Sequence, residues 1–122
     1  MSTRIVVVED ETSIRELYRA KLDIAGYEVR TARDGREGLE IIQNFRPALV
    51  LLDIRMPEMN GDEMLLKMRE TDWGANIRVI ILTNLSKDEA PSRLRFLNVD
   101  RYIVKAHHTP AQIVDIIREI VD

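Results

Sequence analysis

The chain has 122 residues, of which 45% are hydrophobic, and this length and composition suit one domain over residues 1–122 whose core needs no cross-links. The absence of cysteine excludes disulfides and cysteine-based zinc sites, and the net charge of −3 gives no indication of direct nucleic-acid binding. No apolar stretch reaches the length of a membrane span or a signal sequence, so a cytoplasmic protein without membrane contacts is expected.

Short apolar runs alternate along the chain with longer amphipathic stretches. Three uninterrupted runs, Ile5–Val8, Leu49–Leu52 and Val79–Leu82, are typical of strands buried on both faces of a sheet. Two weaker runs, Val29–Ala32 and Tyr102–Val104, predict strands near the sheet edges.

Apolar residues at helical spacing predict a helix after each strand. Gly26 is a natural stop for the first helix. The fourth is short, and Pro91 is tolerable only in its first turn. Thr109 is the expected N-cap of the last helix, with Pro110 at its first position and Gln112 completing a capping box. The positions that mark the five helices are Ile14, Leu17, Tyr18, Leu22 and Ala25; Leu39, Ile42 and Phe45; Met64, Leu65 and Met68; Leu94 and Leu97; and Ile113, Ile116, Ile117 and Ile120.

Five strand–helix units predict an α/β domain with a parallel sheet and helices on both faces. In such sheets, ligands bind at the carboxyl ends of the strands. Four of the five predicted strands end directly in polar residues: Glu9-Asp10, Asp53, Thr83 and Lys105. These side chains are therefore expected to gather at one edge of the sheet.

Three carboxylates in one pocket repel one another, and a divalent cation offsets that repulsion. Mg²⁺ fits best, because it needs one or two carboxylates and keeps waters that phosphate oxygens can replace. Taken singly, the residues have simpler explanations: Glu9 and Asp10 as helix caps, Asp53 as a turn residue, and Thr83 and Lys105 as solvated side chains. Their joint occurrence at one edge favours a shared site.

The chain resembles the receiver domain of two-component response regulators over its whole length. The matching stretches are Val6–Asp10, Leu51–Pro57, Met59–Gly61, Ile80–Thr83 and Tyr102–Lys105. The resemblance implies a flavodoxin-like, doubly wound (βα)5 fold with a five-stranded parallel sheet in the order 2-1-3-4-5.

The same resemblance implies a phosphorylation-dependent signalling switch. Asp53 would accept the phosphoryl group with the help of Mg²⁺, for which Mn²⁺ could substitute. Lys105 and Thr83 would each contact a phosphoryl oxygen. The implied metal ligands are Asp10, Asp53, the backbone carbonyl of Arg55 and, through a water, Glu9.

Phosphorylation in this family draws the threonine toward the site and turns an aromatic residue inward, roles that fall here on Thr83 and Tyr102. Tyr102 could equally be an amphipathic strand residue with its hydroxyl in water. The implied partners are a histidine kinase or phosphotransfer protein and an output protein or domain, with the chain a monomer or a phosphorylation-dependent dimer. It would be no enzyme beyond catalysing its own phosphorylation and dephosphorylation.

Two of the departures from the family pattern directly follow predicted strand-end residues. Ala106 replaces the usual proline after the strand-end lysine, and we predict a trans Lys105–Ala106 bond, since a cis bond before alanine costs about 3 kcal/mol. Asn84 replaces a smaller residue. These departures keep open a non-phosphorylated pseudo-receiver that acts only as an interaction module.

Two other functions fit the sequence less well. A phosphatase of the haloacid-dehalogenase type needs a second Asp two residues after its nucleophile, to protonate the leaving group. Arg55 stands at that position. A flavodoxin-like cofactor binder needs a phosphate-binding loop after the first strand, where Glu9 and Asp10 would repel a phosphate.

Overall fold

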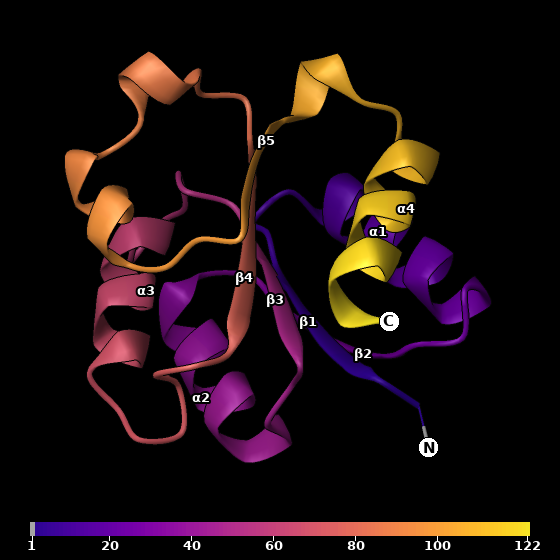
Figure 1. The fold of residues 1–122 in the computed structure, drawn as a ribbon, viewed down its shortest axis with the longest axis horizontal. Helices are drawn as coiled ribbons and strands as arrows, with labels where there is room; N and C mark the ends of the chain where they lie inside the picture. Colours follow the sequence, from indigo (N-terminus) through magenta and orange to yellow (C-terminus); the bar gives the residue numbers. More distant parts are fainter. Residues whose placement is uncertain (1) are drawn as a thin grey trace.

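The computed structural model describes residues 2–122 and contains one five-stranded sheet between two layers of helices (Figure 1). All strands are parallel, and their order is β2-β1-β3-β4-β5. The predicted sheet is confirmed, including the edge positions of the two weaker strands. The strands are β1 (Arg4–Val8), β2 (Glu28–Ala32), β3 (Leu49–Leu52), β4 (Arg78–Thr83) and β5 (Arg101–Val104).

In the part of the chain that the structure describes, four α-helices cover the two faces of the sheet. One face carries the first and last helices, and the other carries the second and third (Figure 1). No helix within residues 2–122 combines the length and the apolar character needed to cross a membrane. The helices are α1 (Thr12–Ile24), α2 (Gly35–Phe45), α3 (Gly61–Arg69) and α4 (Pro110–Val121).

The central strands divide the core into two clusters because successive side chains of a strand point to opposite faces. Val6 and Val8 of β1 pack toward α2 and α3, whereas Ile5 and Val7 pack toward α1 and α4. β3 is buried along its whole length. A sheet held from both sides in this way is a rigid support for side chains at its ends.

The predicted helix ends are largely confirmed. Gly26 follows α1 with a φ of 99°, a left-handed conformation that glycine adopts without strain. Thr109 caps α4, and its hydroxyl accepts a hydrogen bond from the backbone N–H of Gln112 while the Gln112 side chain accepts from the N–H of Thr109.

The prediction of a fourth α-helix between β4 and β5 is wrong, and residues 2–122 contain five strands but four α-helices. Two short 3-10 helices, Lys87–Glu89 and Ser92–Phe96, take its place. Ala90 is extended (φ −70°, ψ 147°), as expected for a residue before proline, and this separates the two turns. Asn98, left-handed with a φ of 54°, ends the stretch. We call residues 84–100 the β4–β5 segment.

The strand register sets the positions of the polar residues. Val8 of β1 is level with Leu52 of β3, so Glu9 and Asp53 leave the sheet side by side. Thr83 of β4 is level with Val104 of β5, which places Lys105 just beyond Thr83. The carboxyl ends of four strands therefore deliver their polar side chains to one edge.

Candidate functional site

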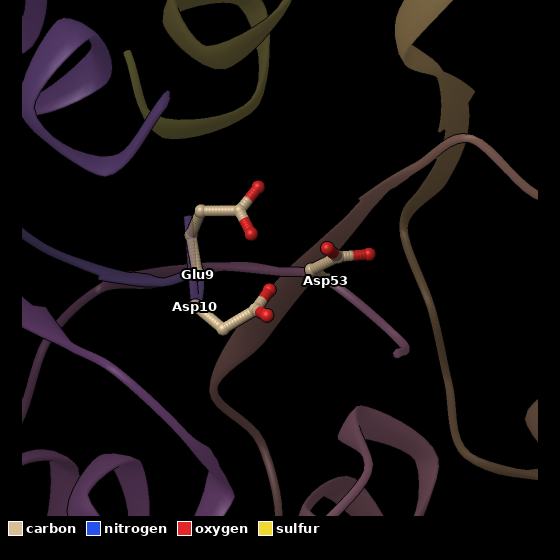
Figure 2. Close-up of side chains that lie close together, drawn as sticks. All are labelled: Glu9, Asp10 and Asp53. Atoms are coloured by element: carbon tan, nitrogen blue, oxygen red, sulfur yellow. The ribbon is translucent and has the colours of Figure 1, made fainter. Parts of the chain in front are cut away.

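Three carboxylates meet at the carboxyl edge of the sheet. Glu9 and Asp10 follow β1, Asp53 follows β3, and one carboxylate oxygen from each lies within 4.8 Å of the other two. Figure 2 shows the Glu9 and Asp10 side chains extending from the same loop toward Asp53. Asp10 is exposed, whereas Glu9 and Asp53 are buried. The predicted acidic cluster thus exists, open on the Asp10 side.

The environment of Glu9 changes the pKa of its carboxyl group. Burial raises its pKa to about 7; a hydrogen bond from Lys105 acts against this rise and the charge of Asp53 adds to it. Only 4% of Glu9 is exposed. A bound cation would offset both the desolvation of the Glu9 carboxylate and its repulsion from the Asp53 carboxylate.

Lys105 connects the two buried carboxylates. Its Nζ atom donates hydrogen bonds to Oε1 of Glu9 and, at 3.3 Å, to Oδ2 of Asp53. Burial alone would lower the pKa of Lys105, but the hydrogen bond to Glu9 and the charge of Asp53 outweigh it and raise this pKa. Lys105 therefore carries its charge directly against Asp53.

Asp53 is held from its own loop as well. Its Oδ1 atom accepts a hydrogen bond of 2.7 Å from the backbone N–H of Ile54, while Oδ2 faces Lys105. Behind it, the N–H of Gly61 at the start of α3 donates to the carbonyl of Ile54 at 2.7 Å. The carboxylate thus has a fixed orientation.

Thr83 and Tyr102 meet through the backbone of one residue, Leu85. Oγ1 of the buried Thr83 accepts a hydrogen bond of 3.4 Å from the Leu85 N–H. The hydroxyl of Tyr102 donates to the Leu85 carbonyl at 2.9 Å, with the Ser86 carbonyl at 3.3 Å. The Tyr102 hydroxyl therefore has main-chain partners in residues 85–86, in addition to any contact with water.

The remaining predicted positions lie around this cluster. Arg55 lies two residues after Asp53 with an exposed side chain, and Asn84 is exposed directly after β4. The Lys105–Ala106 bond is trans, as predicted. Ala106 lies in a 3-10 turn, Lys105–His107.

The sequence analysis missed Arg15 of α1, which is buried and donates hydrogen bonds to the backbone carbonyls of Glu9 and Asp10. A signal for it exists in the sequence. Arg15 precedes Tyr18 and Leu22 by three and seven residues, so it occupies the apolar stripe of its helix. A charged residue on such a stripe calls for a buried partner.

The donor set of the cluster suits a hard divalent cation. All three side chains offer carboxylate oxygens, which Mg²⁺ prefers, and with bonds of 2.0–2.1 Å its opposite ligands lie about 4.2 Å apart. The mutual separations of up to 4.8 Å are close to this value. The desolvated Glu9 adds a reason for a cation to bind. Glu9, Asp10 and Asp53 therefore fit an Mg²⁺ ion, or the chemically similar Mn²⁺.

Comparison with known proteins gives one consistent family. Residues 5–118 match the family model for the response regulator receiver domain. The chain is 37% identical over 107 residues to Response regulator MprA of Mycolicibacterium vanbaalenii, an alignment that covers 86% of this chain and 45% of that protein. The chain therefore spans less than half the length of that relative.

Solved structures agree with the fold. The chemotaxis protein CheY4 of Vibrio cholerae superposes with a TM-score of 0.90 at 27% identity, over 99% of this chain and 100% of that one. A CheY-like response regulator receiver domain protein from Methanospirillum hungatei gives a TM-score of 0.86 at 32% identity, over 98% and 93% of the two chains.

Proposed function

Since the chain belongs to the response regulator receiver domain family and takes part in two-component signalling, we propose that it accepts a phosphoryl group on Asp53 in an Mg²⁺-dependent reaction. We further propose that residues 1–122 form this receiver domain. The observation that carries the proposal is the convergence on Asp53 of Lys105 and the carboxylates of Glu9 and Asp10. A cation beside a carboxylate and room for a metal are what phosphoryl transfer to an aspartate needs.

The metal ligands in this proposal are Asp10, Asp53 and the backbone carbonyl of Arg55, with Glu9 acting through a water. When bound there, Mg²⁺ neutralises negative charge on the attacking carboxylate and on the phosphoryl oxygens. Mn²⁺ would serve in its place.

Asp53 is the nucleophile. One of its carboxylate oxygens attacks phosphorus, so an O–P bond forms. The bond from phosphorus to the imidazole nitrogen of a phosphohistidine, or to the acyl oxygen of a small donor, breaks, and its electron pair leaves with the donor. Lys105 already lies 3.3 Å from Oδ2 of Asp53 and would hold a phosphoryl oxygen as a point charge. Thr83 would donate its hydroxyl to another.

The switch follows from the shared contact with Leu85. If the Thr83 hydroxyl turns to a phosphoryl oxygen, the Leu85 N–H loses its acceptor, and the carbonyl that holds the Tyr102 hydroxyl is free to move. Tyr102 then turns inward. Its side chain lines a groove of about 660 Å³ between β5 and the β4–β5 segment, together with Pro91 and Leu94. Phosphorylation would thus reshape a protein-binding surface by a population shift.

The proposed partners follow from this role. A histidine kinase or phosphotransfer protein supplies the phosphoryl group, and an output protein or domain binds at the groove. The protein would work in the cytoplasm without membrane or direct nucleic-acid contacts, as a monomer or a phosphorylation-dependent dimer. It would turn over no substrate other than its own phosphoryl group.

The test is the intact mass of the protein after incubation with acetyl phosphate, with Mg²⁺ and with EDTA. We expect a single phosphoryl adduct that requires the metal and disappears in Asp53→Asn. Asp23→Asn, at an exposed carboxylate on α1, is the matched control and should form the adduct. A folded protein that forms no adduct under any condition would refute the proposal and leave the pseudo-receiver.

A further inference from the structure

Arg15 is a charged side chain that the fold encloses. It is 9% exposed and lies with Tyr18 and Leu22 on the buried face of α1. Among the ion pairs formed within residues 2–122, none includes Arg15. Because a buried charge is costly unless polar groups surround it, the hydrogen-bond partners of this guanidinium define its role.

Those partners all belong to residues 9–12, which connect β1 to α1. Nη1 donates to the carbonyl of Glu9 at 2.9 Å and to the carbonyl of Asp10 at 3.3 Å. Nη2 donates to the hydroxyl of Thr12 at 3.3 Å. The guanidinium therefore binds the main chain of two consecutive residues whose side chains form two of the three members of the acidic cluster.

Few other hydrogen bonds support this loop beyond Glu9, the N–H of Glu11 donating to Oε2 of Glu9 at 3.3 Å. The N–H of Glu9 still donates to Ala32 of β2 at 3.0 Å, which continues the sheet ladder by one residue. At the start of α1, Glu11 is in the N-cap position but makes no side-chain capping bond. Arg15 thus fixes the carbonyls of Glu9 and Asp10, while the Glu9 carboxylate is held in addition by the Glu11 N–H and by Lys105.

We propose that Arg15 is a positioning residue for the divalent cation, which it serves by fixing the two carbonyls so that the Glu9 and Asp10 carboxylates converge on Asp53. This inference rests on the proposed Mg²⁺ site. Arg15 would act through its planar fork, which reaches two carbonyls and a hydroxyl at once, because its positive charge by itself opposes the binding of a cation.

Two substitutions distinguish the contribution of the planar guanidinium of Arg15 from the contribution of its positive charge. Arg15→Lys keeps the charge but replaces the fork by a single ammonium group, and Arg15→Gln removes the charge. The readout is the Kd for Mg²⁺ from calorimetric titration of the unphosphorylated protein. Positioning predicts that both variants bind Mg²⁺ about 10- to 100-fold more weakly, the range typical for partners that orient metal ligands. Arg19→Lys is the control, since Arg19 is exposed on the same helix and pairs with Glu16 and Asp23, and it should bind as wild type does.

Other results would overturn the proposal. If Arg15 acts only through its charge, Arg15→Lys binds as wild type does and Arg15→Gln binds more tightly. If Arg15 only stabilises the fold, urea unfolding shifts while the Kd of both variants stays unchanged. Should Arg15→Lys be partly unfolded, the rise of its unfolding midpoint with Mg²⁺ concentration still yields the Kd of the folded form.

Thr12→Ala provides a second test, because it removes one acceptor of the guanidinium and leaves Arg15 in place. We expect a smaller loss of Mg²⁺ affinity, of a few-fold. Failure of the proposed function is distinguishable: wild-type protein that binds no Mg²⁺ refutes the metal site itself. Wild-type binding with unchanged affinity in Arg15→Lys refutes only the role of Arg15.

Discussion

Gly61 and Asp53 touch through their backbones, and a Cβ atom on Gly61 would overlap the carbonyl oxygen of Asp53 and lie 2.9 Å from its carbonyl carbon. The start of α3 is thus packed directly against the proposed phosphoryl acceptor. The Gly61 N–H also donates to the carbonyl of Ile54 at 2.7 Å, which holds this approach in place. The position of Asp53 therefore depends on the absence of a side chain at Gly61, the first residue of α3.

We predict that Gly61→Ala lowers the free energy of unfolding by about 2 kcal/mol, because the backbone of β3 or α3 must move to admit the methyl group. It should also slow phosphorylation by acetyl phosphate, since the displaced residue is Asp53. Urea unfolding and the rate of adduct formation check the two parts. The matched control is Gly26→Ala, where the left-handed φ costs stability but a Cβ meets nothing within 4 Å. Equal phosphorylation rates for the two folded variants would contradict the prediction.

Removal of the Lys105 side-chain charge should strengthen Mg²⁺ binding and slow phosphorylation. In Lys105→Met, Glu9 and Asp53 lose the cation that bridges them, so Mg²⁺ no longer competes with an ammonium group. We expect Mg²⁺ to bind about 5-fold more tightly, equivalent to roughly 1 kcal/mol, and phosphorylation to be at least about tenfold slower. Titration and adduct formation give both values. The exposed Lys87→Met is the control, and weaker Mg²⁺ binding in Lys105→Met would contradict the argument.

The pKa of Glu9 predicts a pH-dependent stability of the metal-free protein. Burial, with a contribution from Asp53, raises this pKa from 4.5 to about 7 in the folded state despite the hydrogen bond from Lys105. The folded protein therefore binds this proton more tightly than the unfolded chain, so the contribution of Glu9 is fully present below about pH 4.5 and is lost as the pH rises through about 7.

The measurement is urea unfolding of wild type and Glu9→Gln across this pH range in EDTA. Wild type should lose stability relative to Glu9→Gln as the pH rises, because glutamine does not ionise. Saturating Mg²⁺ should reduce the loss, since the cation favours the ionised carboxylate. A difference that is independent of pH would show that the pKa of Glu9 is ordinary.

An ion pair ties α3 to the β4–β5 segment. Nε of Arg93 lies 2.7 Å from Oδ2 of Asp62, whose side chain is 7% exposed whereas that of Arg93 is 46% exposed. We predict that Arg93→Ala lowers the free energy of unfolding by about 1.5 kcal/mol, because it leaves the buried Asp62 carboxylate without its partner. A double-mutant cycle with Asp62→Asn should give a coupling energy above about 0.5 kcal/mol. Arg95→Ala, at an exposed position in the same 3-10 turn, should leave stability nearly unchanged.

The residues at the strand ends were predictable, and the contacts behind them were not. The unbroken apolar runs located β1, β3 and β4. In a parallel sheet the residues that follow the strands, here Asp53 and Lys105, then lie at one edge whatever the conformation of the loops. The apolar stripe of α1 indicated that Arg15 is buried but not which groups it binds, and the pair of Asp62 with Arg93 depends on how a helix packs against a loop, which no local pattern specifies. Each joins charged or polar groups across different elements.

The predicted α-helix between β4 and β5 does not form, for a reason that lies in the local sequence. The pattern of Leu94 and Leu97 has helical spacing, but the extended Ala90 before Pro91 and the left-handed Asn98 leave fewer than two turns between them. A stretch so short does not repay the nucleation of an α-helix. A count of strand–helix units therefore overestimates the number of α-helices, because it ignores how many residues are available to each helix.

The 3-10 turns between β4 and β5 have a consequence for the order in which parts of the molecule open. Their i→i+3 hydrogen bonds are weaker than those of an α-helix, and Ser92, Arg93 and Phe96 are exposed. Amide protons of this segment should exchange with solvent through local opening far below the free energy of global unfolding, whereas those of β1 and β3 should exchange only when the whole domain unfolds. The surface that would answer phosphorylation can therefore rearrange while the acidic edge that receives the phosphoryl group keeps its geometry.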